Sequence, residues 1–297
     1  MSLVVDGLST AIFSTASSGT LTGFSNSNAG DIIICQIFFE NLAASRTVST
    51  VTTSGLTWTR RSQTINHMCF NADNVPDTWG TLEVWWAYSS AVLTNASVAI
   101  TLSAAIDNCA VMCWGVSGFN GTFYQTNPWD INGSLPAIAT GNVSIPTVAG
   151  VSTTSSNTLG IMTQAGFAAE AAGTGWTNFN SILNNGGTFS AYTSRQTQLF
   201  PSPQSSATWS FTNSVRSWAT IADALVQNPA ASVTTKQIKN SLSAPDGSEY
   251  GTLTDGAGTL VVTSTTSTGN TKQIKNSRLA PDGSKYMTLT DGNGNLV

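Results

Sequence analysis

Charge is the property that this sequence has least of. Only 9% of its 297 residues are charged, against roughly 25% in an average soluble domain. The first 235 residues contain no lysine, and the formal net charge of −4 is spread thinly along the chain. A nucleic-acid-binding surface needs clustered Lys and Arg side chains. We therefore expect no nucleic acid among the partners of this protein.

Long apolar segments are also lacking. No stretch approaches the ~18 consecutive apolar residues that a membrane helix needs. The first residues, MSLVVDGLSTAIFS, lack the basic start and the apolar run of a secretory signal peptide. We expect a protein that is made in a cytoplasm and does not insert into a membrane.

Side chains that commonly act in catalysis or metal binding are scarce. The one histidine, His67, lies in a loop-like stretch without a nucleophile motif. Asp73, Asp77 and Glu83 are close enough in sequence to suggest a glycosidase pair. However, Asp73 and Asp77 lie among Asn and Pro residues, where acids typically stabilise turns. The spacings of zinc and calcium sites are absent from the sequence, as are phosphate-binding Gly motifs. We expect neither enzymatic activity nor a cofactor.

The four cysteines are too few for a disulfide framework in a chain of this length. Cys109 and Cys113 would share one face of a strand about 13 Å apart, too far to bridge each other. Together with Cys35 they are interpreted as small apolar core residues. Cys69 leaves two alternatives open, an exposed thiol or a partner across a subunit interface.

What the sequence has in abundance is short β-branched and aromatic runs separated by Gly, Asn and Ser. No stretch sustains the 3.6-residue period of a helix, so the pattern predicts an all-β protein. The expected strands are 31–39, 47–53, 56–61, 81–89, 97–103, 109–117, 158–164, 189–196, 207–212 and 217–226.

The segments of residues 30–228 also repeat in order. GDIIICQIFF, SGLTWTRR, LEVWWAYSS, ASVAITLSA and DNCAVMCWGV are followed by NTLGIMTQAG, GTGWTNFN, FSAYTSRQT, SATWSFTNS and RSWATIADAL. We predict that the two halves supply matching strands to one jelly-roll-like β-sandwich, with Trp58 and Trp176 in equivalent places.

The C-terminal region is a clear tandem repeat. Residues 235–261 and 271–297 match at 21 of 27 positions with a period of 36, and all five lysines of the chain lie here. We predict a sandwich domain at 1–229 and a small module of β-hairpin repeats at 230–297. A unit this short cannot fold alone, so it must stack on its twin or on another subunit. We expect a homo-oligomer, a homotrimer in the first instance.

The expected interface residues are the lysine, isoleucine, tyrosine and leucine positions of both repeats. For the lysine pairs, an alternative role is the protection of edge strands from unwanted pairing. The residues are Lys236, Ile238, Lys239, Tyr250, Leu253, Lys272, Ile274, Lys275, Tyr286 and Leu289.

Two patterns resemble structural proteins of tailed bacteriophages. The first is GD, an apolar run, GLTWTR, LEVWWAY, ITLS, GVSGFN and NPWD over residues 30–130; the second is the ending APDGS, TLTDG and LV. The resemblance implies a non-enzymatic virion component: capsid decoration, head fibre, collar or tail fibre. It implies docking onto other virion proteins, such as the major capsid protein, after synthesis in the host cytoplasm.

The tryptophans support a second hypothesis. Trp79 in DTWG and Trp129 in NPWD are expected in loops, where an indole can stack on a sugar ring. This would make the chain a receptor- or glycan-binding fibre module that recognises a host surface glycan. Alternatively, the two side chains anchor their loops or a protein interface.

Overall fold

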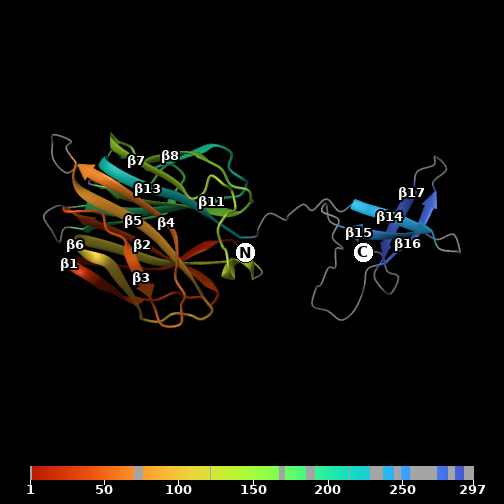
Figure 1. Ribbon diagram of the computed structural model, residues 1–297, viewed down its shortest axis with the longest axis horizontal. Coiled ribbons are helices and arrows are strands. Elements are labelled where there is room, and N and C mark those ends of the chain that lie inside the picture. Colours follow the sequence, from red (N-terminus) through yellow and green to blue (C-terminus); the bar gives the residue numbers. More distant parts are fainter. Residues whose placement is uncertain are drawn as a thin grey trace. The chain divides into compact units, whose positions relative to one another are not determined.

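The computed structural model describes residues 2–69, 76–120, 122–166, 171–184, 191–213, 215–227, 237–243, 249–254, 273–279 and 285–290. The chain divides into two compact units, Met1–Ala230 and Ala231–Val297. Apart from one 3-10 turn, η1 (Phe123–Gln125), all regular structure in these ranges is β-strand (Figure 1). The predicted all-β class is confirmed.

The first half of the N-terminal unit forms one antiparallel six-stranded sheet. Its order is β1-β6-β2-β5-β4, and β3 pairs with β6 beside this path. The strands are β1 (Val4–Phe24), β2 (Asp31–Asn41), β3 (Val48–Thr52), β4 (Thr59–Cys69), β5 (Pro76–Ser89) and β6 (Ala96–Ser117).

The second half repeats this arrangement. Its five-stranded sheet has the order β7-β13-β9-β11-β10. In this order the strands correspond to β1, β6, β2, β5 and β4 of the first sheet. In addition, β8 pairs with β12. The strands are β7 (Ala137–Ser144), β8 (Thr147–Val151), β9 (Thr158–Gly166), β10 (Thr177–Asn184), β11 (Ala191–Phe200), β12 (Ala207–Ser210) and β13 (Val215–Val226).

Backbone details support this equivalence. Gly30 and Asn157 directly precede β2 and β9 and have φ angles of 85° and 53°. A register shift, typical of a β-bulge, lies near the start of both β4 and β10. Trp58 and Trp176 directly precede these two strands. The tryptophans therefore occupy the same place in the topology, whereas a superposition of the two halves stays a prediction.

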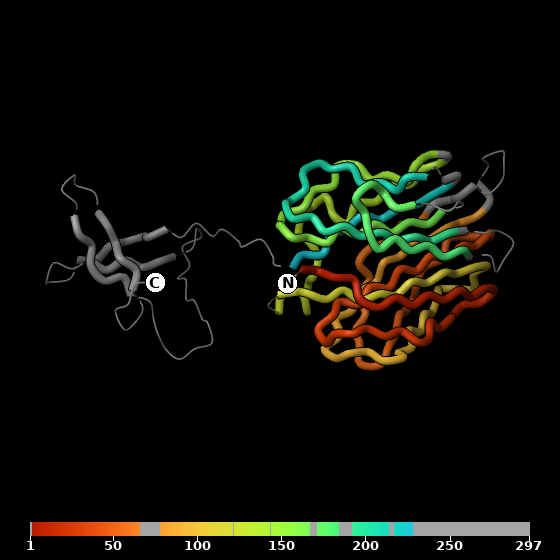
Figure 2. Tube along the Cα trace, turned by 180° about the vertical axis from the view of Figure 1, so that it is seen from behind, coloured from red at the N-terminus to blue at the C-terminus, as the bar shows by residue number. Residues whose placement is uncertain are grey.

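The two large sheets pack face to face, as in a β-sandwich, with the first half below the second in Figure 2. Between them lies a core that includes Ile34 and Trp114 from the first sheet and Ile161 and Ile221 from the second. β4 contacts β13 and β7, and its counterpart β10 contacts β6 and β1. The halves are therefore related by an internal approximate two-fold arrangement, as two subunits of a symmetric dimer would be.

Each large sheet also has a core on its outer face. In the first half, β3 and parts of β1 and β6 cover it; in the second half, β8 and β12 do so. This covering on both faces means that the predicted β-sandwich takes one sheet from each half. It also explains why β2 and β9 are buried at every residue. The jelly-roll connectivity stays a prediction.

Several strands differ from the sequence-based expectation. The two strands expected at 97–103 and 109–117 are one continuous strand, β6, and the strand expected at 56–61 begins only at Thr59. β1 was not expected, because its Ser-, Thr- and Gly-rich sequence lacks an apolar run. β1 lies at a sheet edge and is partly exposed, so its residues do not need to be apolar.

The described part of the C-terminal unit consists of two antiparallel hairpins. β14 (Gln237–Ser243) pairs with β15 (Glu249–Thr254), and β16 (Gln273–Leu279) pairs with β17 (Lys285–Thr290). Ile238 is opposite Leu253, and Ile274 is opposite Leu289. The two hairpins therefore have the same register at the 36-residue period of the sequence.

Candidate functional site

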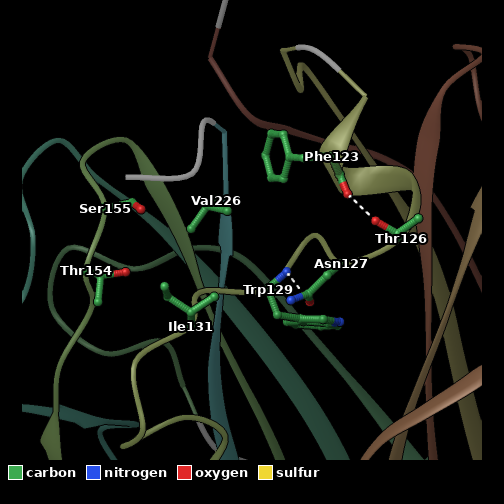
Figure 3. Close-up of a pocket in the computed structure, with 8 residues that line it drawn as sticks. All are labelled: Phe123, Thr126, Asn127, Trp129, Ile131, Thr154, Ser155 and Val226. Carbon is green, nitrogen blue, oxygen red and sulfur yellow. Dashed lines mark hydrogen bonds between the residues drawn. The ribbon is translucent and has the colours of Figure 1, made fainter. Parts of the chain in front are cut away.

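A small cavity lies at one end of the N-terminal unit, between η1, the loops that follow β6 and β8, and the end of β13 (Figure 3). Its volume is about 220 Å³, smaller than the ~300–1,000 Å³ of typical ligand pockets. None of the lining side chains is charged, so the cavity suits an uncharged ligand. They are Phe123, Thr126, Asn127, Trp129, Ile131, Thr154, Ser155 and Val226.

Asp130 fixes the two loops that form one side of this cavity. Its carboxylate accepts hydrogen bonds from the backbone N–H groups of Asn132, Thr154 and Ser155 and from the Thr154 hydroxyl, at 2.8–3.2 Å. Its own N–H donates to the carbonyl of Ala224 in β13 at 2.9 Å. Because this carboxylate is 3% exposed and both of its oxygens accept hydrogen bonds, it holds the two loops together.

Trp129 lies between the cavity and the interface of the two halves. Its ring is 2% exposed and packs edge-to-face against Trp86, with 6.5 Å between centroids. The Arg61 guanidinium lies over the Trp129 ring, 5.0 Å from its centroid. The same guanidinium binds both carboxylate oxygens of Asp223 at 2.7 and 3.1 Å. The indole therefore packs mainly against protein, and a sugar could reach it only through the cavity.

The Arg61–Asp223 pair joins a β4 bulge in the first half to β13 in the second. Burial raises the pKa of Asp223, and its hydrogen bond and charge interaction with Arg61 oppose that effect. A bulge redirects a side chain relative to a regular strand. Sequence analysis missed this ion pair, because the bulge and the 162-residue separation leave no local signal.

Asp6 occupies the place in the first half that Asp130 occupies in the second. Asp6 lies opposite Gly115 on β6 and accepts hydrogen bonds from the Ser27 N–H at 2.7 Å and the Asn28 amide at 3.0 Å. Both acids thus bind the loop that leads into the central strand of their half. The sequence offered one weak signal, an acid after an apolar residue in VVDG and in PWDI.

Beside Asp6, the first half carries a second carboxyl group. Asp31 is fully buried, and its Oδ2 accepts a hydrogen bond from the Asn26 amide at 2.7 Å. Within the described residues, its Oδ1 has no partner. Burial, opposed by the Asn26 hydrogen bond and reinforced by the Asp6 charge, raises the pKa of Asp31 to about 6. At the equivalent position the second half has Thr158.

The two tryptophans that we considered as glycan contacts do not lie together. Trp79 is on β5, opposite Asn41, and is half-buried with contacts of its own. It precedes Trp86 by seven residues, about 23 Å at ~3.3 Å per residue of a strand. Because Trp86 contacts Trp129, the two candidates lie far apart and cannot share one sugar.

Of the candidate catalytic residues, only Glu83 has a described side chain. Glu83 is fully buried and accepts hydrogen bonds from the Val48 N–H and the Trp85 indole, both at 2.8 Å. The side chains of His67, Cys69 and Asp77 lie outside the described residues, as does all of Asp73.

Of the expected interface residues, eight lie on the hairpin strands, and Lys236 and Lys272 lie outside the described residues. The eight are Ile238, Lys239, Tyr250, Leu253, Ile274, Lys275, Tyr286 and Leu289. Their role in contacts with other chains stays a prediction.

No protein-family model, no curated protein and no solved structure matches this chain. In the part of the chain that the structure describes, no group of three or more His, Cys, Asp or Glu side chains could hold a metal ion. The same residues contain no helix of the length and apolar character needed to span a membrane.

Proposed function

We propose that this protein is a non-enzymatic structural component of a bacteriophage virion, in the capsid-decoration or head-fibre class. It acts by self-association and by docking onto other virion proteins, of which the major capsid protein is the first candidate. The observation that carries the proposal is the repeated hairpin, whose register places the same residue types in the same positions twice. The resemblance of both regions to phage structural proteins supports the virion location.

The repeats supply the attachment. An isolated two-stranded hairpin is marginally stable in water, so each repeat gains stability by packing against its twin or another chain. Two linked weak contacts raise the overall affinity through effective concentration. A homotrimer would bury the apolar residues of all the hairpins around one axis.

Truncation after Pro229 tests this attachment. Because the N-terminal unit is compact by itself, we expect the truncated chain to fold but to be absent from purified particles. Mass spectrometry of particles would give its copy number beside that of the full chain. Unchanged incorporation of the truncated chain would contradict an anchoring role of the repeats, and absence of the full chain from particles would contradict the virion proposal itself.

A second candidate function is glycan binding at the Trp129 cavity. The uncharged lining and the loops fixed by Asp130 favour a small neutral ligand such as one sugar residue. The test is a glycan titration followed by tryptophan fluorescence, with Asn127→Ala as the cavity variant and Trp79→Phe as a variant distant from the cavity. Saturable binding that Asn127→Ala weakens and Trp79→Phe leaves unchanged is expected; no binding by the full chain would dismiss this function.

A further inference from the structure

Two buried cysteines of the first half are direct neighbours across strands. Cys35 on β2 lies opposite Cys113 on β6. Both are fully buried in the core on the outer face of the first sheet, and both are free thiols. Directly opposed residues of antiparallel strands have Cα atoms ~4.5–5.5 Å apart. This lies within the ~4.4–6.8 Å that a disulfide spans.

The register brings the side chains of Cys35 and Cys113 to the same face of the sheet, in the same buried core. Cys109 shares the same core but lies opposite Phe39, not opposite a thiol. The sequence had suggested only that Cys109 and Cys113 cannot bridge. The strand register now provides a different pair.

The second half shows that the fold does not need a thiol at either position. At the equivalent places, Met162 on β9 lies opposite Ala222 on β13, and both are fully buried. The first half thus has two sulfhydryl groups at positions where, in the second half, a thioether and a methyl group are sufficient for packing. The pair Met–Ala is therefore a substitution that the architecture already accepts.

We propose that Cys35 and Cys113 are a latent disulfide site, oxidised by thiol–disulfide exchange with a small disulfide such as oxidised glutathione. One cysteine thiolate attacks the small disulfide, forming a mixed disulfide and releasing one small thiolate. The second cysteine thiolate then attacks the protein sulfur and releases the other. The protein loses two protons and two electrons in forming its S–S bond, and the oxidant is reduced to two thiols.

Burial sets the conditions for this reaction. It raises the pKa of Cys113, and the neighbouring Cys35 side chain adds to that effect. Exchange requires a thiolate and access to it. The reaction is therefore slow in the folded protein and fast during folding or transient opening. If the chain is a virion component as proposed above, the bond forms through transient opening after release from the reducing cytoplasm.

The experiment refolds the full chain from denaturant in oxidised glutathione and then alkylates the remaining thiols under denaturing conditions. Intact-mass measurement should show two alkylated cysteines instead of four, and peptide mapping should join Cys35 to Cys113. The oxidised protein should unfold at a temperature higher by about 5 °C or more, because the bond closes a long loop.

Two variants serve as controls. Cys109→Ala should still form the bond, whereas the double variant Cys35→Met with Cys113→Ala, which copies the second half, should keep both remaining thiols. The proposal is overturned if the refolded wild type keeps four alkylated cysteines or if the bond maps to Cys69 or Cys109. Because the readout needs no particle, its failure is distinct from failure of the virion proposal.

Discussion

The two halves of the N-terminal unit share a backbone plan but differ in how they use polar side chains. Both have the same strand order and an aspartate that binds the loop before the central strand. In the first half, Trp114 lies opposite Ile34. In the second half, Asp223 lies opposite Ile161, which is the counterpart of Ile34. Asp223 therefore occupies the position of Trp114. The comparison shows that topology can repeat while the chemistry of equivalent positions diverges.

The interface between the two halves shows this difference in polar side chains most clearly. Arg61 of the first half binds Asp223 of the second, and Arg195 of the second half lies over the Trp114 ring of the first, 4.6 Å from its centroid. Each half therefore places an arginine against the other half. The residues that the two arginines contact, Asp223 and Trp114, occupy equivalent positions. One arginine neutralises a buried charge, whereas the other is held by an aromatic face, and the two should differ strongly in their effect on stability.

The largest expected effect is at Arg61. Arg61→Met should lower the free energy of unfolding by about 3–5 kcal/mol at neutral pH, because it leaves Asp223 buried and unpaired. Chemical denaturation followed by tryptophan fluorescence measures this, since all nine tryptophans precede residue 230. Adding Asp223→Asn to the variant should recover part of the loss. A loss below about 1 kcal/mol would show that Asp223 does not depend on this arginine.

Arg195→Met, the same change at the second arginine that reaches across the two halves, should cost far less. Arg195 is 2% exposed, its Nε and Nη1 have no partner within the described residues, and burial lowers its pKa to about 10. Its removal loses a cation–π contact of about 0.5–2 kcal/mol but relieves the cost of a buried charge. We expect a net change within about 1 kcal/mol by the same denaturation assay. A loss as large as that of Arg61→Met would contradict the contrast between the two positions.

The third prediction concerns pH and contrasts Asp31 with Thr158. The folded-state pKa of Asp31, about 6, exceeds the ordinary value of 3.8. The protonated form therefore stabilises the fold below pH 3.8, and this contribution is lost as pH rises through about 6. Asp31→Asn should stabilise the unit by about 1–2 kcal/mol at pH 8 and have little effect at pH 4. Thr158→Val, the control, should shift stability equally at both pH values; an equal shift for Asp31→Asn would refute the prediction.

The smallest expected effect is at the left-handed residues before the central strands. A side chain at Gly30, where φ is 85°, would place its Cβ 3.2 Å from the Tyr124 hydroxyl. Gly30→Asn, which copies the second half, should cost about 1 kcal/mol. The reverse change, Asn157→Gly, should alter stability by only a few tenths. Thermal unfolding of both variants measures the difference, and equal shifts would show that the two loops are interchangeable.

The candidate site shows where sequence analysis reached its limit. Trp129 was identified from its loop motif, but its burial against Trp86 and Arg61 depends on how the two sheets stack. Asp130 and Thr154, which fix the cavity wall, were not predicted, because they meet only when the loops after β6 and β8 come together. Glu83 was noted as an acid, but its hydrogen bonds to Val48 and Trp85 could not be foreseen.

By itself the sequence determined the all-β class, the central strands β2 and β9, and the order of the repeated segments. Apolar runs and turn residues are local signals, and burial on both faces of a strand appears directly as an uninterrupted apolar run. Only the tertiary structure decided that each half forms its own sheet, that polar β1 is a long edge strand, and that Arg61 meets Asp223. Those features depend on which faces stack and where a bulge turns a side chain, and these contacts between distant residues leave no periodic pattern in the chain.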